Sequence, residues 1–231
     1  MANVATHTET RARTRDVLWA DVEDVYASIL AHPFLAGLAD GSLPRAAFRH
    51  YIVQDGHYLR GYARALALCA TKATDPAETA MFAEHAAGAI AAERELHAEL
   101  MVELGTSPDE AVREPVAPTT RAYVSYLLAT GFSGSYAEAV AAVLPCYWIY
   151  ARVGTELLAR SSPDPLYARW IAMYGGEQFQ AVVDAVLVVT DRIGAEVSGA
   201  ELAVMREHFT TTSRYEWMFW DAGYRRETWP V

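Results

Sequence analysis

Residues 48–69 read FRHYIVQDGHYLRGYARALALC, and this stretch decides the fold class. Its apolar positions recur at alternating spacings of four and three residues, which is the period of one helix face. That face consists of Phe48, Ile52, Asp55, Leu59, Tyr62, Leu66 and Cys69. A carboxylate, that of Asp55, therefore lies in the middle of the side that the helix would bury.

Helix signals continue along the rest of the chain. Ser135 with Glu138, and Ser198 with Glu201, form the capping-box pattern that opens a helix, and prolines and glycines cluster at the breaks. We predict helices over residues 11–31, 44–73, 75–105, 119–130, 135–160, 165–174, 177–193 and 198–226, with a short turn at 107–110.

These patterns predict an all-α protein, a single-domain helical bundle that spans residues 1–231. No stretch alternates with period two, no internal repeat is evident, and the loops are too short to contain a domain boundary. Whether residues 1–10 are ordered stays open.

Composition excludes several classes of protein. The net charge of -10 disfavours nucleic-acid binding, which needs a basic face, and two cysteines do not make a disulfide scaffold. The longest uncharged apolar run, between Glu138 and Arg152, contains Pro145 and is too short to cross a membrane. The first 16 residues lack the apolar segment of a secretory signal. We expect a cytoplasmic protein with reduced thiols and no nucleic-acid or membrane partner.

Two further helices carry a polar group on an apolar stripe. One stripe contains Val143, Cys146, Tyr150, Val153 and Leu157, and the other contains Leu202, Met205, Phe209, Ser213, Glu216 and Trp220. Burial of an ionised carboxylate is costly unless it is paired or hydrogen-bonded. Two carboxylates and one thiol thus face inward from three helices, which is typical of a functional site.

The residues beside these groups indicate what they do. Aromatic neighbours on both sides of Glu216 predict a pKa raised by desolvation, which suits a proton donor near neutral pH. Tyr58 follows Asp55 by three residues and Tyr150 follows Cys146 by four, so we expect their rings to flank a flat heterocycle.

Ordinary structural roles remain alternatives for each group. A buried cysteine is more often a small hydrophobe than a nucleophile, a carboxylate on an apolar stripe is as often a structural anchor, and an aromatic-rich helix is usually core. Glu93 fits such an anchor, with Arg64 as its partner. No Glu-x-x-His or Cys-x-x-Cys pair occurs, so we expect no metal site.

Pro145 lies next to Cys146 and within the helix that opens at Ser135. A proline inside a helix removes a hydrogen bond, so we expect a kink or break there. Cys146 would then lie near the start of a new helical segment, whose positive dipole end would lower the pKa of the thiol.

A set of blocks along the chain carries a resemblance to a known family. They are HPF at 32–34, FRHYIVQDGHYL at 48–59, Glu93 with Leu96–His97, LPCYWIY at 144–150, Trp170–Ile171, YGG at 174–176, RYE at 214–216, FWD at 219–221, Tyr224 and Trp229. The most specific feature is PCYW with QD upstream and YExxFWD downstream. In these blocks the chain resembles the TenA family, also called thiaminase II or aminopyrimidine aminohydrolase.

The resemblance implies a haem-oxygenase-like fold without haem, no cofactor, and a homotetramer. It implies hydrolysis of a small-molecule aminopyrimidine, 4-amino-5-aminomethyl-2-methylpyrimidine, to hydroxymethylpyrimidine and ammonia, as a step of thiamin salvage. Thiamin would be cleaved by the same chemistry to hydroxymethylpyrimidine and thiazole. Cys146 is similar to the nucleophile of the cysteine-containing branch of the family.

The remaining roles follow from the same resemblance. It makes Glu216 the proton donor and Asp55 the carboxylate that binds the amino group and a neighbouring nitrogen of the pyrimidine. It makes Tyr150 and Tyr174 substrate contacts, and it makes Tyr58 and Tyr123 the aromatic residues that tune the nucleophile.

One residue departs from the family pattern, because His57 stands where many relatives have an aromatic side chain. Three alternatives to salvage hydrolysis stay open: a family member with another small amine as substrate, a non-catalytic pyrimidine- or thiamin-binding or regulatory protein, and a haem-binding protein.

Overall fold

The computed structural model describes residues 12–160 and 162–231, except for the side chains of residues 92–99. The question of order in residues 1–10 and the expected pairing of Glu93 with Arg64 lie outside the described part. Within that part the chain is helical and contains no strand, in agreement with the all-α prediction. None of the described helices is both long enough and apolar enough for a membrane span.

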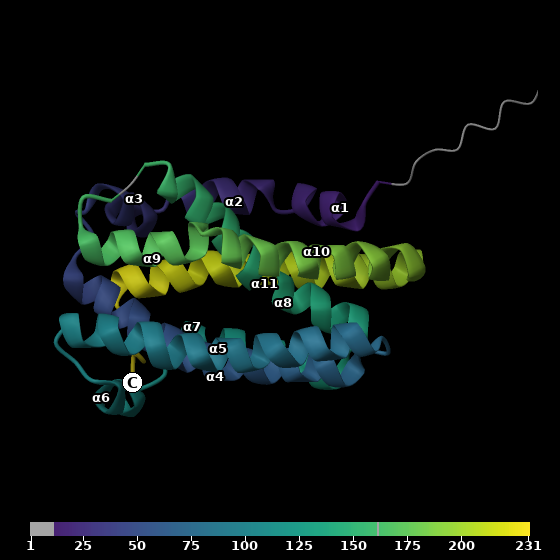
Figure 1. Ribbon diagram of the computed structural model, residues 1–231, viewed down its shortest axis with the longest axis horizontal. Helices are drawn as coiled ribbons and strands as arrows, with labels where there is room; N and C mark the ends of the chain where they lie inside the picture. Colours follow the sequence, from purple (N-terminus) through teal and green to yellow (C-terminus); the bar gives the residue numbers. More distant parts are fainter. Residues whose placement is uncertain (1–11, 161) are drawn as a thin grey trace, which may run out of the picture.

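The described helices are α1 (Thr14–Ala20), α2 (Glu23–Leu30), α3 (Pro33–Asp40), α4 (Arg45–Lys72), α5 (Pro76–Glu103), α6 (Pro108–Arg113), α7 (Pro118–Ser133), α8 (Tyr136–Leu158), α9 (Pro165–Gly175), α10 (Glu177–Glu196) and α11 (Gly199–Arg225). In Figure 1 the long helices α4 and α5 run side by side. The helix α11 contacts α4 and α8, while α10 contacts α8 and α9. The most buried helix, α8, packs against α4, α7, α9, α10 and α11.

The segment expected to form one helix forms two, α1 and α2, and a third helix, α3, follows them in the sequence. The chain turns at Asp21–Val22, so that α1 and α2 replace one helix over 11–31. The helix α3 was not predicted, because His32-Pro33 reads as a stop signal. Here His32 also starts a helix: its Nδ1 accepts a hydrogen bond from the Phe34 N–H at 3.1 Å, and Pro33 occupies the first helical position.

Two expected helix ends are also different. The helix α7 continues through Gly131 to Ser133, because this glycine serves close packing: a Cβ there would lie 2.8 Å from Leu68 Cδ1. At the start of α11 the Ser198 hydroxyl accepts from the Glu201 N–H, but the reciprocal half of the capping box is missing. The Glu201 carboxylate instead accepts a hydrogen bond from the Ser135 hydroxyl, which caps α8.

The expectation of a new helical segment near Cys146 is wrong. The helix α8 runs unbroken from Tyr136 to Leu158 with Pro145 inside it, so Cys146 lies mid-helix and far from a positive dipole end. A side chain from α4 supports this turn, because the Tyr62 hydroxyl donates to the Val143 carbonyl at 2.9 Å. Packing on all sides of α8 therefore outweighs the single hydrogen bond that the proline removes.

Candidate active site

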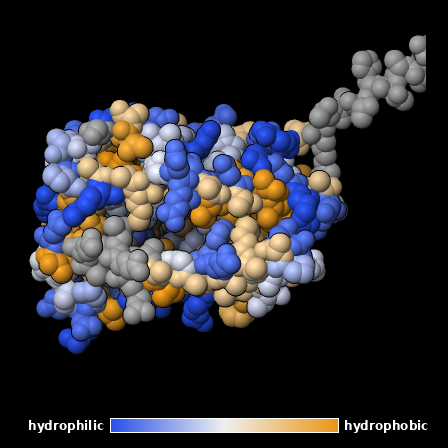
Figure 2. Space-filling view, in the orientation of Figure 1, coloured by the Kyte–Doolittle hydropathy of each residue, from blue (hydrophilic) through white to orange (hydrophobic). Residues whose placement is uncertain are grey.

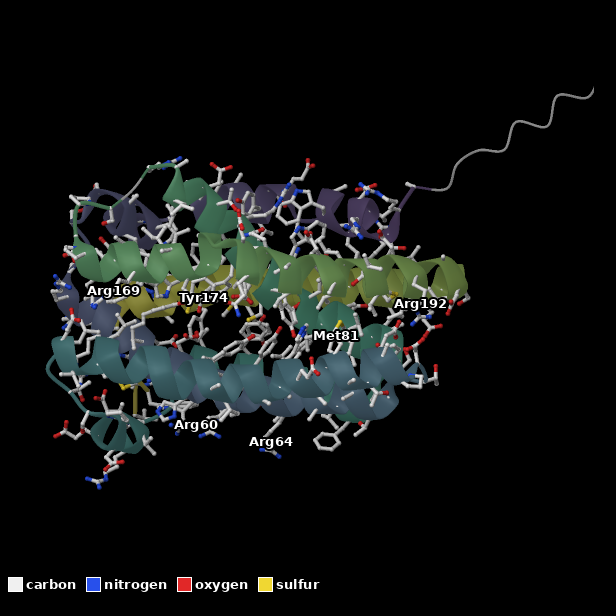
Figure 3. All side chains as sticks on the ribbon, viewed as in Figure 1. Arg60, Arg64, Met81, Arg169, Tyr174 and Arg192 are labelled. Carbon is white, nitrogen blue, oxygen red and sulfur yellow. The ribbon has the colours of Figure 1, made fainter. Side chains whose placement is uncertain are left out.

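A cavity of about 420 Å³ lies where α4, α5, α8, α9 and α10 meet. Asp55 lines it from α4, Cys146 and Tyr150 from α8, and Tyr174 from α9. Figure 3 shows Tyr174 in the space between α9 and α5, and in Figure 2 the surface between these elements is hollowed. Four of the seven site residues expected from the sequence therefore share one chamber.

The stripe on α4 explains how the cavity gains its wall. Asp55, Leu59, Tyr62 and Leu66 are consecutive members of that stripe, and all four line the cavity. Phe48 and Ile52, earlier on the same face, are fully buried in the core. The apolar face of α4 thus packs in the core at its N-terminal end and lines the cavity from Asp55 onward.

Cys146 lies deep in the molecule with one side open to the cavity. Burial raises the pKa of its thiol well above the ordinary value, and the nearby carboxyl groups of Glu216 and Asp55 raise it further. The hydroxyls of Tyr58 and Tyr62, which lie near the sulfur, act in the opposite direction. The cysteine is therefore a neutral thiol at rest, which corrects the expectation of a dipole-lowered pKa.

Glu216 is buried in α11 and is 1% exposed. The Tyr123 hydroxyl donates to its Oε1 at 2.6 Å. Burial raises the pKa of the Glu216 carboxyl to about 8, the hydrogen bond from Tyr123 lowers it, and Asp55 raises it. The carboxyl group is thus protonated in most molecules at neutral pH, as its aromatic surroundings predict.

Glu216, Tyr123 and Tyr58 do not line the cavity, but they lie just behind its wall. Glu216 and Asp55 both act on the pKa of Cys146, and Asp55 acts on that of Glu216. All three groups act on the hydroxyl of Tyr174. The thiol, the acid and the second carboxylate are therefore close enough to feel each other's charge, although they come from three helices.

Tyr58 and Tyr150 do not flank the cavity as a pair, which differs from the expectation. Tyr58 packs against Tyr62, with ring centroids 5.4 Å apart, and against Tyr123 at 4.9 Å, so it does not face Tyr150 across the cavity. Tyr150 instead meets Tyr174 at 4.9 Å with a 52° tilt. Its hydroxyl lies 3.0 Å from that of Tyr51, a contact that fixes the ring.

Residues 19–226 match the TENA/THI-4/PQQC family. The chain belongs to this family. Its relatives include aminopyrimidine aminohydrolases of Bacillus subtilis, which is 37% identical with 86% of this chain and 84% of the relative covered, and of Helicobacter pylori, 33% identical with 90% and 97% covered. The expected TenA family is confirmed, and the chain is an enzyme of the thiaminase II type.

Solved structures give the same result for the fold. A TenA homologue from P. horikoshii OT3 superposes with a TM-score of 0.85 at 29% identity, covering 93% of this chain and 99% of that one. A domain from Shewanella denitrificans OS217 described as having a heme oxygenase-like fold superposes with a TM-score of 0.71 at 14% identity, covering 92% of each chain. The expected haem-oxygenase-like fold is therefore confirmed.

His57, the departure from the family pattern, does not line the cavity. Its Nε2 lies 3.0 Å from the carbonyl oxygen of Glu114, in the segment that follows α6. The substitution thus concerns the contact between α4 and that segment and leaves the lining of the cavity as it is.

Sequence reasoning missed the residues that α5 and α10 contribute to the cavity. These are Glu84, His85, Gly88 and Ala89 from α5 and Gln178, Phe179 and Val182 from α10. The α5 residues carried no signal, because α5 is rich in alanine on every side and shows no apolar stripe. The helix α10 is amphipathic, but its apolar face carries no ionisable group that would have marked a site. Among the described residues no group of three or more His, Cys, Asp and Glu side chains is arranged to hold a metal ion.

Proposed function

We propose that this enzyme hydrolyses 4-amino-5-aminomethyl-2-methylpyrimidine to hydroxymethylpyrimidine and ammonia in thiamin salvage, and that it also cleaves thiamin to hydroxymethylpyrimidine and thiazole. The single observation that carries the proposal is the meeting of a neutral thiol, a carboxyl group with a pKa of about 8 and a second carboxylate around one cavity. The curated relatives named aminopyrimidine aminohydrolase support the choice of substrate.

Asp55, Tyr150 and Tyr174 bind the pyrimidine in this proposal. They line the same cavity, and each has a polar group at the end of a buried side chain. The Asp55 carboxylate accepts hydrogen bonds from the exocyclic amino group, while the two tyrosines enclose the ring edge. A substrate held at several points reacts faster because its orientation is fixed before the chemistry begins.

Cys146 attacks the ring and Glu216 supplies the proton that makes the attack possible. Sulfur adds to a ring carbon while the Glu216 carboxyl gives its proton to a ring nitrogen, and the carboxylate then takes the proton that the thiol loses. The net transfer moves one proton from sulfur to nitrogen, so no full charge builds up in a buried site. Tyr123 tunes Glu216 through its hydrogen bond, and the nearby Tyr58 hydroxyl lowers the pKa of Cys146.

The electron-rich ring then expels the leaving group from the exocyclic methylene. The protonated amine departs as ammonia, or the thiazolium of thiamin as neutral thiazole, in each case with the bonding electron pair, and an exocyclic double bond forms between the ring and the methylene carbon. Water adds to that carbon and loses a proton, the ring electrons return, and the carbon–sulfur bond breaks as the ring nitrogen gives up its proton. One of these two protons restores the thiol, and the other goes to the released ammonia or to solvent. A direct displacement by water would lack this electron push, which is why the nucleophile is needed.

The deciding experiment is product analysis with the purified protein and each of the two substrates. We expect hydroxymethylpyrimidine from both, with ammonia from the first and thiazole from the second. A Cys69→Ser variant is the matched control, because Cys69 is buried on α4 outside the cavity. Binding of either compound without any product would favour the pyrimidine-binding or regulatory alternative, and turnover of another small amine alone would favour a different substrate.

Two further expectations complete the proposal: composition predicts a cytoplasmic enzyme, and the family resemblance implies a homotetramer. Light scattering on the eluted peak of a size-exclusion column measures the mass directly. A mass of four chains of 25.4 kDa supports the tetramer, and a monomer mass contradicts it.

A further inference from the structure

The α5 side of the cavity contains a histidine to which the proposed chemistry assigns no role. His85 is half-buried and lines the cavity together with the exposed Glu84. Its Nδ1 lies 3.0 Å from the hydroxyl of Tyr147, which is the residue next to Cys146. The imidazole is therefore tied to the helix that carries the nucleophile, although it comes from the opposite wall.

Packing around Tyr147 holds this pair in place. Tyr147 is 5% exposed, and its ring meets that of Tyr62 edge-on at 5.7 Å and that of His85 at 5.6 Å. When Nδ1 carries the ring hydrogen and donates it to the Tyr147 hydroxyl, Nε2 is the unprotonated nitrogen that can accept a proton from a molecule in the cavity. A hydrogen bond to one ring nitrogen commonly fixes the orientation and the tautomer of a functional imidazole.

The surroundings favour a neutral imidazole. Burial lowers the pKa of His85, and Glu84 on the same helix partly offsets the shift. The other titratable groups around the cavity are Cys146, Tyr147 and Tyr150 on α8, Asp55 and Tyr62 on α4, and Tyr174 on α9, while α10 presents the uncharged Gln178 and Phe179. At neutral pH the ring can therefore accept a proton.

The second half of the reaction needs such an acceptor. Water that attacks the methylene carbon must lose a proton, and Glu216 is no acceptor for it, because its carboxyl group has recovered the thiol proton and is protonated in most molecules at neutral pH. Asp55 is engaged with the substrate in the proposed function, and burial raises the pKa of each lining tyrosine well above 10, which makes a tyrosine hydroxyl a poor proton acceptor. The Glu84 carboxylate is exposed to solvent, whereas the His85 imidazole is half-buried at the wall of the cavity.

We propose that His85 is a further catalytic residue, the general base for the water that attacks the exocyclic methylene, and that Tyr147 is its positioning residue. The oxygen–carbon bond forms as the water proton moves to His85 Nε2. The exocyclic double-bond electrons enter the ring, and the carbon–sulfur electrons leave with sulfur. The imidazolium then returns its proton to the thiolate or to solvent. This inference rests on the proposed function.

The test separates the two halves of the reaction with a conservative variant. His85→Asn retains a side-chain N–H near the Nδ1 position, and with it a partner for Tyr147, but removes the basic nitrogen. We expect a normal first burst of thiazole from thiamin, and steady-state turnover reduced about a hundredfold. Intact-protein mass spectrometry is expected to find the pyrimidine adduct accumulated on Cys146, and added imidazole is expected to restore part of the turnover.

Tyr147→Phe and His208→Asn are the companion variants. Tyr147→Phe leaves the imidazole without its partner, so we expect a smaller loss, about tenfold, in the same second half. His208 forms a similar pair, with Nδ1 2.8 Å from the Tyr126 hydroxyl, but it does not line the cavity. His208→Asn therefore controls for the loss of a histidine–tyrosine contact, and we expect unchanged turnover.

Three results would overturn the inference. His85→Asn with wild-type turnover would remove the need for this base. Loss of the thiazole burst without any adduct, in a variant that unfolds at the wild-type temperature, would place His85 in the first half. If the wild-type protein itself gives no product from thiamin or the aminopyrimidine, the proposed function fails first, and the two failures are thereby distinguishable.

Discussion

Two regions of this protein each combine a buried glutamate, a tyrosine that donates to it and a cysteine nearby. In one region Tyr136 donates to Glu78 at 2.9 Å, and Cys69 is close enough to raise the pKa of that tyrosine. In the other, Tyr123 donates to Glu216 at 2.6 Å beside Cys146. The same three side-chain types thus occur twice in one bundle.

The difference between the two regions is a single cation. Arg192 binds both oxygens of Glu78, with Nε and Nη2 each 2.7 Å from an oxygen, so the charge is paired where it is buried. Among the described residues no cation pairs with Glu216, and its carboxyl group has a pKa of about 8. One glutamate therefore locks two helices together, and the other is left able to exchange a proton.

The cysteines differ for a related reason. Cys69 is fully buried, its pKa is raised to about 12 by burial, and no cavity reaches it. Cys146 faces the cavity and two tyrosine hydroxyls. We expect Cys146→Ser to lower turnover of the aminopyrimidine about a thousandfold or more, because the nucleophile is lost. Cys69→Ser is expected to alter stability alone, and steady-state kinetics of both variants measure the contrast.

A loss of activity shared equally by the two serine variants would mean that both act through folding. Circular dichroism and a thermal unfolding curve for each variant exclude that interpretation when the proteins are folded. Equal turnover in Cys146→Ser and wild type would remove the nucleophile from the mechanism.

The glutamates provide the next largest contrast. Glu216→Gln removes the proton donor but leaves an acceptor for Tyr123, so we expect turnover to fall about a hundredfold or more while the fold is kept. Glu78→Gln leaves the cavity residues unchanged, and we expect near wild-type turnover with reduced stability. The two values of kcat at pH 7 test the comparison, and a larger loss in Glu78→Gln would reverse it.

Arg192 is expected to matter for stability rather than for rate. Arg192→Met leaves Glu78 buried with only a tyrosine as partner, which we expect to destabilise the fold by about 2 kcal/mol, since the arginine is partly exposed. Urea unfolding measures this cost. The double variant with Glu78→Gln is expected to recover part of it, and a double variant no better than Arg192→Met would contradict the pairing argument.

The last contrast is a dependence of stability on pH. The pKa of Glu216 is raised on folding, so its stabilising contribution is complete below about pH 4.3, the unfolded value, and is lost as pH rises to about 8. Relative to Glu216→Gln, the wild type is expected to lose up to about 1.4 kcal/mol per pH unit in this window. Unfolding free energies at pH 5, 6, 7 and 8 measure the slope, and parallel curves would contradict it.

Sequence periodicity was sufficient to predict which side chains of a single helix face the interior. It placed Asp55, Cys146 and Glu216 on inward faces, because the 3.6-residue period fixes which side chains share a face. It did not predict α3, since His32-Pro33 carries stop and start signals at once. It also misjudged Pro145, because the neighbours that support α8 are distant in sequence.

The tertiary structure determined which residues meet. His85 and Tyr147 are 62 positions apart and lie on different helices, and the alanine-rich α5 offers no stripe that would mark the histidine. Tyr58 shares a helix with Asp55, yet its ring turns toward Tyr62 and Tyr123 instead of the cavity. Such contacts depend on how the helices cross, and the sequence pattern of a single helix does not predict this.

The amino-acid order alone made this chain an all-helical bundle and selected the polar groups that point into it. The sequence neighbours of Glu216 also predicted its raised pKa, but only the three-dimensional arrangement showed that the pKa of the Cys146 thiol is raised and that Glu78 is paired with a cation. Arg192 reaches Glu78 across 114 positions of sequence, while Glu216 is enclosed by aromatic side chains and a single hydroxyl donor. The pKa of a buried carboxyl group depends on the water it has lost and on the charges within a few ångströms, and both are set by the packing of helices.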